Sequence, residues 1–106
     1  WIDTATARFY TGSKDYRHSN HQCALIWVEW YNADKDEYVI SHDEYDLDCR
    51  MRRTLYATFY NGQNKVINSY NGSYDDFVDI IPGSNGESVY DAVVLLKETR
   101  ENARRL

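Results

Sequence analysis

The chain has few of the features that mark specialised folds or a known catalytic chemistry. Its 106 residues include only two cysteines, one proline and five glycines, and they contain no repeat, linker or low-complexity segment. No apolar run approaches the roughly 20 residues that a membrane-spanning helix needs. The nucleophile elbow, the glycine-rich phosphate loop and the H-E-x-x-H helix are also absent. We therefore expect one globular domain, residues 1–106, that has no catalytic site, no cofactor and no membrane span.

Acidic residues outnumber basic ones, 17 to 12, which gives a net charge of −5. A chain with this balance is not expected to bind nucleic acid, because it has too few cations to neutralise the phosphates. The basic cluster of Arg50, Arg52 and Arg53 is local. Structural ion pairs explain it most simply, and an anion site is the alternative.

Aromatic residues are abundant, with ten tyrosines, three tryptophans and three phenylalanines. Tyrosine and tryptophan suit a pleated, half-buried sheet surface, because each has a large apolar body and a polar tip. The alternative is an exposed, tyrosine-rich contact face of the kind found at protein interfaces. Composition alone leaves both interpretations open.

Alternating apolar residues predict a series of short strands. Cys23–Tyr31 is the clearest, with Leu25, Trp27 and Tyr31 on one face and apolar residues on the other. Asn61-Gly62 predicts a two-residue hairpin turn. The predicted strands are 1–10, 23–31, 38–48, 49–60 and 65–70, after which 74–81 carries the chain to a helix. This order predicts an α+β fold, an antiparallel meander of about five or six strands with one C-terminal helix packed on it.

The helix has a clear start signal. Pro82-Gly83 ends the apolar segment, and Ser84 with Glu87 forms an S-x-x-E capping box. Apolar residues then follow at helical spacing and form one stripe that packs on the sheet. They are Val89, Ala92, Val93 and Leu96.

The histidines do not suggest a metal site. His18 and His21 are three residues apart, but zinc needs three or four convergent ligands and no third one can be placed. We therefore interpret these two and His42 as solvated loop residues and expect no metal. The acidic band Asp43–Asp48 lacks the glycine of a calcium loop, so we interpret it as a charged, solvated strand edge.

Cys23 and Cys49 flank two segments predicted to form a hairpin. If the chain turns near residues 33–36, the two thiols lie on neighbouring strands within reach of each other. We favour a disulfide between them, which would contribute roughly 3 kcal/mol by the loop-entropy model. Two reduced cysteines in a cytosolic protein are the alternative.

Several features occur together in an order that is similar to a known family. These are Trp1, the aromatic strand Ile26-Trp27-Val28-Glu29-Trp30, the stretch Asp48-Cys49-Arg50-Met51-Arg52-Arg53, the hairpin sequence Tyr60-Asn61-Gly62 and the helix start Pro82-Gly83-Ser84-Asn85-Gly86-Glu87. Their order resembles the surface-adhesin protein E family of exported proteins of Gram-negative bacteria, over Trp1 to about Leu96. The family often has a cysteine near the end of the closing helix, which this chain lacks, and no ligand-binding segment of the family can be mapped onto it.

The resemblance implies export to the periplasm, the outer membrane or the extracellular space, and it implies adhesion to host matrix proteins such as laminin or vitronectin. From it we expect a non-enzymatic domain that contacts a protein partner through its aromatic strand. The expected contact residues are Trp27, Trp30 and Tyr31, with Arg50 and Arg52 as charged anchors.

Two other functions fit the same residues. One is a small-ligand carrier with a pocket between sheet and helix, lined by Tyr38, Tyr45, Tyr56 and Phe59. The other is a self-associating structural protein that buries its two-faced apolar strand in a homodimer. Trp27 and Trp30 can equally be core residues.

Overall fold

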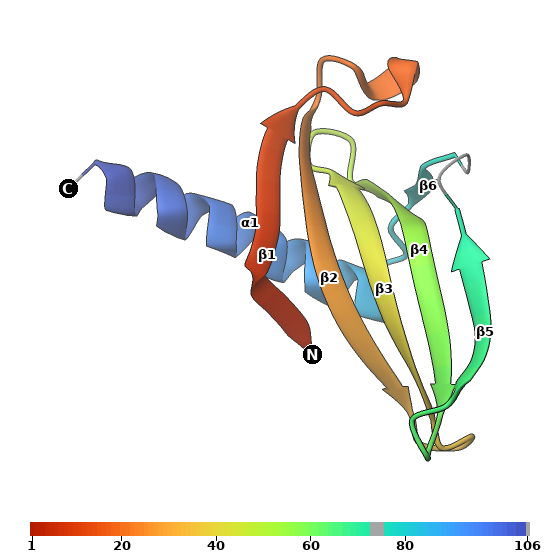
Figure 1. The fold of residues 1–106 in the computed structure, drawn as a ribbon. Helices are drawn as coiled ribbons and strands as arrows, with labels where there is room; N and C mark the ends of the chain where they lie inside the picture. The colour runs from red at the N-terminus through yellow and green to blue at the C-terminus, as the bar shows by residue number, and fades with distance from the viewer. Residues whose placement is uncertain (73–75, 106) are drawn as a thin grey trace.

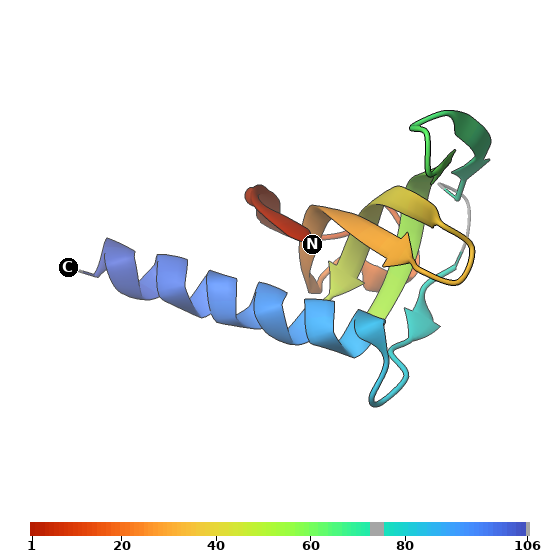
Figure 2. The ribbon, with the colours of Figure 1, turned by 90° about the horizontal axis from the view of Figure 1, so that it is seen from below.

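The computed structural model describes residues 1–72 and 76–105, which form an antiparallel sheet with a helix across one of its faces (Figures 1 and 2). The strands are β1 (Ile2–Thr11), β2 (Gln22–Asn32), β3 (Glu37–Asp46), β4 (Met51–Asn61), β5 (Val66–Asn71) and β6 (Val78–Asp79). A short 3₁₀ helix, η1 (Tyr16–His18), precedes β2, and α1 (Asn85–Arg104) closes the chain. The predicted α+β fold is confirmed.

The sheet is a meander in which each strand from β1 to β5 pairs with the next, and β6 pairs with β4 beside β5. The β2–β3 hairpin is regular from Cys23↔Asp46 to Asn32↔Glu37. Its turn ends at Asp36, which has a positive φ of 48°. Of the expected segment 74–81, residues 74 and 75 lie outside the described part of the chain.

The β4–β5 turn differs from the two-residue hairpin that Asn61-Gly62 predicted. Asn61 is still in β4, and β5 begins only at Val66. The Asn61 side chain accepts hydrogen bonds from the backbone N–H of Gln63 (2.9 Å) and Lys65 (3.0 Å). Asn64 takes the positive φ, 63°. This asparagine side chain organises a longer turn that a two-residue loop could not accommodate.

The two faces of the sheet have different environments. The face that α1 covers, here called the helix face, buries Ala24, Ile26 and Val28 of β2 almost completely. The opposite face, here called the open face, carries Leu25, Trp27 and Tyr31, as the alternation predicted. The core on the helix face consists of Ala7, Ala24, Ile26, Val28, Tyr45, Ile80, Val89, Tyr90 and Val93.

A β-bulge in β4 changes which side chains share a face. His42 pairs with Tyr56 and Asp43 with Thr54, so Leu55 is an extra residue in β4. An extra residue shifts the alternation by one position. As a result Arg52 and Thr54 lie on the helix face together with Ala57 and Phe59, and all four line one groove. Uninterrupted alternation along β4 would place Arg52 and Thr54 on the face opposite Ala57 and Phe59.

The capping box at the start of α1 is confirmed. The Ser84 hydroxyl accepts from the Glu87 N–H (3.3 Å), and the Glu87 carboxylate accepts from the Gly83 N–H (3.2 Å). Gly83 has a φ of 78°, which glycine adopts without strain. Val89 and Val93 of the predicted stripe are buried against the sheet. In the described part of the chain, no helix has the length and apolar character needed to cross a membrane.

The second half of α1 crosses β1 on the helix face and projects past the edge of the sheet (Figures 1 and 2). The Arg100 guanidinium fastens it there by donating to the backbone carbonyls of Ala7 (2.9 Å) and Thr4 (3.0 Å). Both carbonyls belong to an irregular stretch of β1, where the register with β2 shifts between Asp3 and Arg8. The side chain thus supplies donors to a segment whose ladder is interrupted.

Candidate functional site

The open face carries two rows of aromatic rings that cross three strands. The cross-strand pairs align Trp27 with His42 and Tyr31 with Tyr38, and β4 extends each row. The Trp27 and His42 rings stack 4.4 Å apart at 5°. We call these the aromatic rows: Trp27, His42 and Tyr56 form the first, and Tyr31, Tyr38 and Tyr60 form the second.

The aromatic rows remain accessible to solvent. Trp27 is 37% exposed, Tyr56 49% and Tyr31 66%. In the second row the rings of Tyr38 and Tyr60 stack 4.9 Å apart. Stacking fixes the orientation of these rings before any partner arrives, which lowers the entropic cost of burying them in a complex.

The five residues predicted to contact a partner do not share one surface. Trp27 and Tyr31 lie on the open face, whereas Trp30 is on the helix face and packs against the core. Arg50 is in the β3–β4 turn, where it pairs with Glu87 at 3.2 Å. Arg52 points into the groove on the helix face. Only Trp27 and Tyr31 therefore lie together as predicted, because strand alternation and the bulge in β4 separate the others.

A groove of about 660 Å³ lies on the part of the helix face beside the start of α1. Trp30, Phe59 and Tyr70 line its apolar side, while Arg52 and Gly86 lie near the helix start. Ser41, Asp43 and Thr54 supply polar groups to the groove.

The groove differs from the pocket expected from the sequence. Of the predicted lining residues, Phe59 does line it. Tyr38 and Tyr56 belong to the aromatic rows of the open face. Tyr45 is fully buried in the core. Tyr56 and Phe59 are three positions apart in one regular stretch of β4, so strand alternation places them on opposite faces.

Asp43 is the buried acid of the groove, with 1% of its surface exposed. Its carboxylate accepts from the Thr54 hydroxyl at 3.0 Å and from the Ser41 hydroxyl at 3.3 Å, and Arg52 is 3.9 Å away. Burial raises the pKa of the Asp43 carboxyl, and the hydrogen bonds and the Arg52 charge offset only part of this effect. Folding therefore disfavours the ionised form of Asp43 relative to its protonated form.

The Asp43→Asn variant is expected to melt at a higher temperature than the wild type near neutral pH. In the folded protein the pKa of Asp43 lies above its ordinary value of 3.8. Between pH 3.8 and this raised pKa, the folded protein therefore binds more protons than the unfolded one. Stability is therefore lost as the pH rises through this window, and asparagine removes that loss. The difference should shrink below about pH 3.8. Melting curves from pH 3 to 8 test this, with the exposed Asp79→Asn as control; a less stable Asp43→Asn protein at pH 7 would contradict it.

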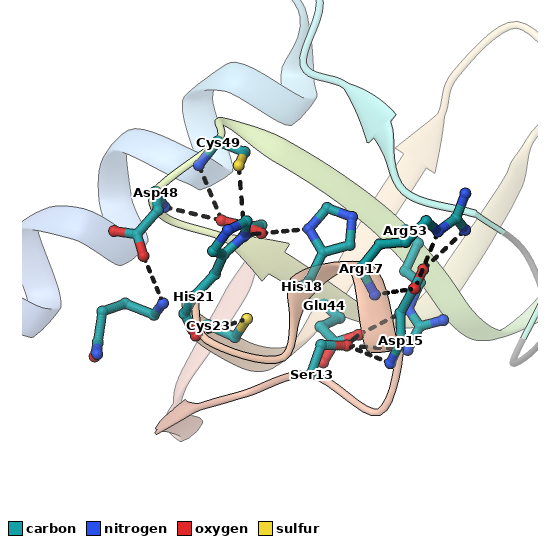
Figure 3. A network of polar contacts seen from close by, with 12 residues as sticks. Ser13, Asp15, Arg17, His18, His21, Cys23, Glu44, Asp48, Cys49 and Arg53 are labelled. Carbon is teal, nitrogen blue, oxygen red and sulfur yellow. Dashed lines mark hydrogen bonds and ion pairs between the residues drawn. The ribbon is translucent and has the colours of Figure 1, made fainter.

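On the open face, where Glu44 pairs with Leu25 and Arg53, a polar network ties the segment before β2 to the sheet (Figure 3). Arg53 and Glu44 form a buried ion pair at 2.7 Å, and the Ser13 hydroxyl donates to the same carboxylate oxygen at 3.0 Å. The Tyr10 hydroxyl donates to the other oxygen. Burial and this hydrogen bond raise the pKa of Tyr10. The network provides hydrogen-bond partners for the Glu44 carboxylate, which has almost no contact with water.

Beside this network, His18, His21, Asp46 and Cys49 place their ligand atoms within 4.8 Å of one another. Both histidine Nδ1 atoms contact the same Asp46 oxygen, at 2.5 Å from His18 and 2.6 Å from His21. The Cys49 sulfur lies 3.4 Å from His21 Nδ1. Burial raises the pKa of Asp46, but the hydrogen bonds from the two histidines outweigh it, so the pKa lies below its ordinary value.

This cluster does not have the geometry of a cysteine nucleophile with a histidine base. In such a pair the sulfur and the orienting carboxylate contact different ring nitrogens, whereas here both face His21 Nδ1. Desolvation, followed by the charges of Asp46 and Asp48, also raises the pKa of the Cys49 thiol. The arrangement therefore does not activate the thiol.

The prediction of a disulfide between Cys23 and Cys49 is wrong, because both cysteines are free. Cys23 pairs with Asp46 in the β2–β3 ladder, and Cys49 follows three residues later in the turn. The Cys23 thiol is buried and donates to the His21 carbonyl (3.5 Å), while the Cys49 sulfur faces the His21 ring. Burial raises the pKa of Cys23 to about 12.

The interpretation of the histidines as solvated loop residues is also corrected. His18 is 8% exposed and packs on Phe77, with ring centroids 4.2 Å apart. His42 is stacked on Trp27. The sequence did carry a signal for their surroundings: Asp46 and Cys49 have the same three-residue spacing as His18 and His21. It was missed because Asp46 was assigned to a solvated edge and Cys49 to a disulfide.

No family model, curated protein or solved structure matches this chain. The resemblance to the surface-adhesin protein E family therefore remains a prediction that rests on the sequence features quoted above.

Proposed function

We propose that this chain is a non-enzymatic binding domain that contacts a protein partner through the aromatic rows of its open face. The observation that carries the proposal is the alignment of six aromatic rings across β2, β3 and β4 on the face opposite α1. Large aromatic side chains dominate the binding energy of protein interfaces. Trp27, Tyr31 and Tyr56 are exposed on this face, and an exposed aromatic patch on a sheet is a natural place for a partner to bind.

The surroundings of the rows favour a protein over a polyanion. The chain has a net charge of −5, which disfavours phosphate-rich ligands. Arg8 and Glu29 flank the first row on the open face and provide charges of both signs, as in the polar rim of an interface. We place the protein outside the cytoplasm, with a host matrix protein as partner, on the strength of the adhesin resemblance; the free thiols remove the support that a disulfide would have given to export.

The Tyr56→Ala variant is expected to bind the partner at least about 30-fold more weakly, which corresponds to a hot-spot loss of about 2 kcal/mol. Immobilised wild-type protein is first screened against purified extracellular matrix proteins by biolayer interferometry, and the affinities of Trp27→Ala and Tyr56→Ala for any partner found are then measured. Melting temperatures show whether each variant is still folded.

Tyr70→Ala is the matched control, because Tyr70 is an equally exposed strand tyrosine, 44% against 49% for Tyr56, but lines the groove instead. Loss of binding in the Tyr70 variant but not in the Tyr56 variant would overturn the proposal. So would light scattering that shows concentration-dependent dimers abolished by Tyr56→Ala, because the rows would then bind a second copy of the chain.

A small-ligand carrier is the second candidate function. The groove on the helix face favours it, because apolar rings and a few polar groups converge there around about 660 Å³. Arg52 makes small aromatic anions the class to test first. A thermal-shift screen of such compounds should find ligands that stabilise the wild type and Tyr56→Ala but not Arg52→Gln. Equal stabilisation of all three proteins would rule out the groove as their site.

A further inference from the structure

We propose that His18, His21, Asp46 and Cys49 form a binding site for a single zinc ion. The proposal is independent of the proposed function, because Asp46 is the last residue of β3, the other three residues lie outside β2 and β3, and none belongs to the aromatic rows. The two nitrogen atoms, one oxygen and one sulfur all lie within 4.8 Å of one another. They are the donor types that zinc takes in proteins.

The ligands come as two pairs with the same spacing. His18 and His21 flank the end of η1, and Asp46 and Cys49 flank the start of the β3–β4 turn, so the sequence reads H-x-x-H and D-x-x-C. Structural zinc sites are commonly built from two segments that each present a pair of ligands a few residues apart. The antiparallel pairing of β2 with β3 brings the two loops to the same end of the sheet.

The backbone holds each pair in place before any ion binds. One Asp46 oxygen accepts from the N–H groups of Asp48 and Cys49, both at 2.9 Å, which fixes the turn and leaves the other oxygen for the histidines. On the other loop, the His18 and His21 carbonyls accept from the N–H groups of Ser13 (3.2 Å) and Gly12 (2.9 Å). Outer contacts of this kind orient ligands in metal sites.

A purely hydrogen-bonded network explains this arrangement less well. A single Asp46 oxygen receives both imidazole Nδ1 atoms, and the Cys49 sulfur approaches one of the same nitrogens at 3.4 Å. One hydrogen on His21 Nδ1 cannot serve the oxygen and the sulfur well at the same time. A cation at the centre uses a lone pair of each of the four atoms instead: each neutral imidazole carries its proton on Nε2, and the thiol proton is released to solvent.

The change of geometry that zinc requires is small. With bonds of about 2.0–2.3 Å to a tetrahedral ion, ligand atoms lie roughly 3.3–3.8 Å apart. The two histidine contacts with Asp46, at 2.5 and 2.6 Å, must therefore open by roughly 1 Å, while the most distant atoms, within 4.8 Å, move closer. Side-chain rotations of the two histidines and the exposed Cys49 provide this movement.

The donor set selects the metal and suggests its role. Sulfur and imidazole nitrogen disfavour calcium and magnesium, which prefer oxygen, and a four-coordinate N, N, O, S set fits zinc. Four protein ligands leave no open position for a substrate, so the site is structural. The ion would join the loop before β2 to the β3–β4 turn and thereby hold the end of the sheet together.

Titration of the reduced, chelator-treated protein with zinc in a calorimeter tests the proposal. We expect one ion per chain and a higher melting temperature when zinc is bound. Cobalt serves as the spectroscopic probe, because a tetrahedral site with a thiolate ligand gives intense visible bands and a sulfur-to-cobalt charge-transfer band. Cys49→Ser should abolish the charge-transfer band and weaken zinc binding by more than roughly 100-fold, a larger loss than that of an outer-shell partner.

Cys49 is exposed, so its serine variant is expected to fold normally without metal. Asp46→Asn and His21→Ala extend the test if their metal-free melting temperatures stay close to that of the wild type. Cys23→Ser and His42→Ala are matched controls outside the cluster and should bind zinc like the wild type. Absence of binding by the wild type, a stoichiometry well below one, or unchanged affinity in Cys49→Ser would overturn the proposal.

Discussion

The Ile26→Ala variant is expected to unfold with a free energy about 2–5 kcal/mol lower than that of the wild type. Ile26 has 0% of its surface exposed and belongs to the core that α1 and the sheet share. Alanine leaves a cavity between β2 and the helix, which rigid strand and helix backbones cannot fill by collapsing. Urea denaturation followed by circular dichroism measures the change, provided that the slope with denaturant is the same for both proteins.

Ile67→Ala is the control for this variant, because Ile67 is also a strand isoleucine but is 49% exposed on β5. It should change the free energy of unfolding by no more than about 0.5 kcal/mol. An Ile26→Ala loss as small as that of the control would contradict the packing of α1 on the sheet described above.

The Arg53→Met variant is expected to lose about 3–5 kcal/mol of stability, the cost of leaving a buried charge without its partner. Glu44 is 3% exposed, and Arg53 contacts it at 2.7 Å. Methionine keeps much of the side-chain volume but leaves the carboxylate, among the residues that the structure describes, with only the hydroxyls of Tyr10 and Ser13. Those neutral donors do not replace a charge.

Two further variants separate this effect from loss of packing. In the double variant Glu44→Gln with Arg53→Met, the uncompensated charge is gone, so much of the stability should return. Arg50→Met removes a solvated ion pair with Glu87 and should cost no more than about 1 kcal/mol. If the double variant were as unstable as Arg53→Met alone, the loss would be one of packing and the electrostatic explanation would be wrong.

The strands and the helix could be predicted because their signals are local. Alternation along β2 assigned Trp27 and Ile26 to opposite faces correctly, and Ser84 with Glu87 marked the start of α1. The bulge at Leu55 could not be predicted, because it is defined only by the pairing of β4 with β3. It brings Arg52 to the same face as Phe59, where uninterrupted alternation would separate them, and so adds a charged side chain to the lining of the groove.

The candidate sites were less predictable than the fold, because each is assembled from segments distant in sequence. Trp27 and Tyr31 were identified, but the rows they belong to depend on the register of three strands. Cys49 was assigned to a disulfide because the lengths of the strands bring it near Cys23. The turn after Asp46 instead directs its sulfur at His21. Side-chain direction within a turn is set by hydrogen bonds that spacing does not encode.

Arg100 has a consequence for how the sheet can be extended. An unpaired strand edge can recruit a strand from another chain. At β1 the ladder is irregular, and the guanidinium occupies two of its carbonyls. On the other side β5 is exposed along its whole length and presents Val66 and Ile67. The two edges of the sheet therefore differ: an added strand would pair with β5, whereas the irregular ladder and Arg100 block pairing at β1.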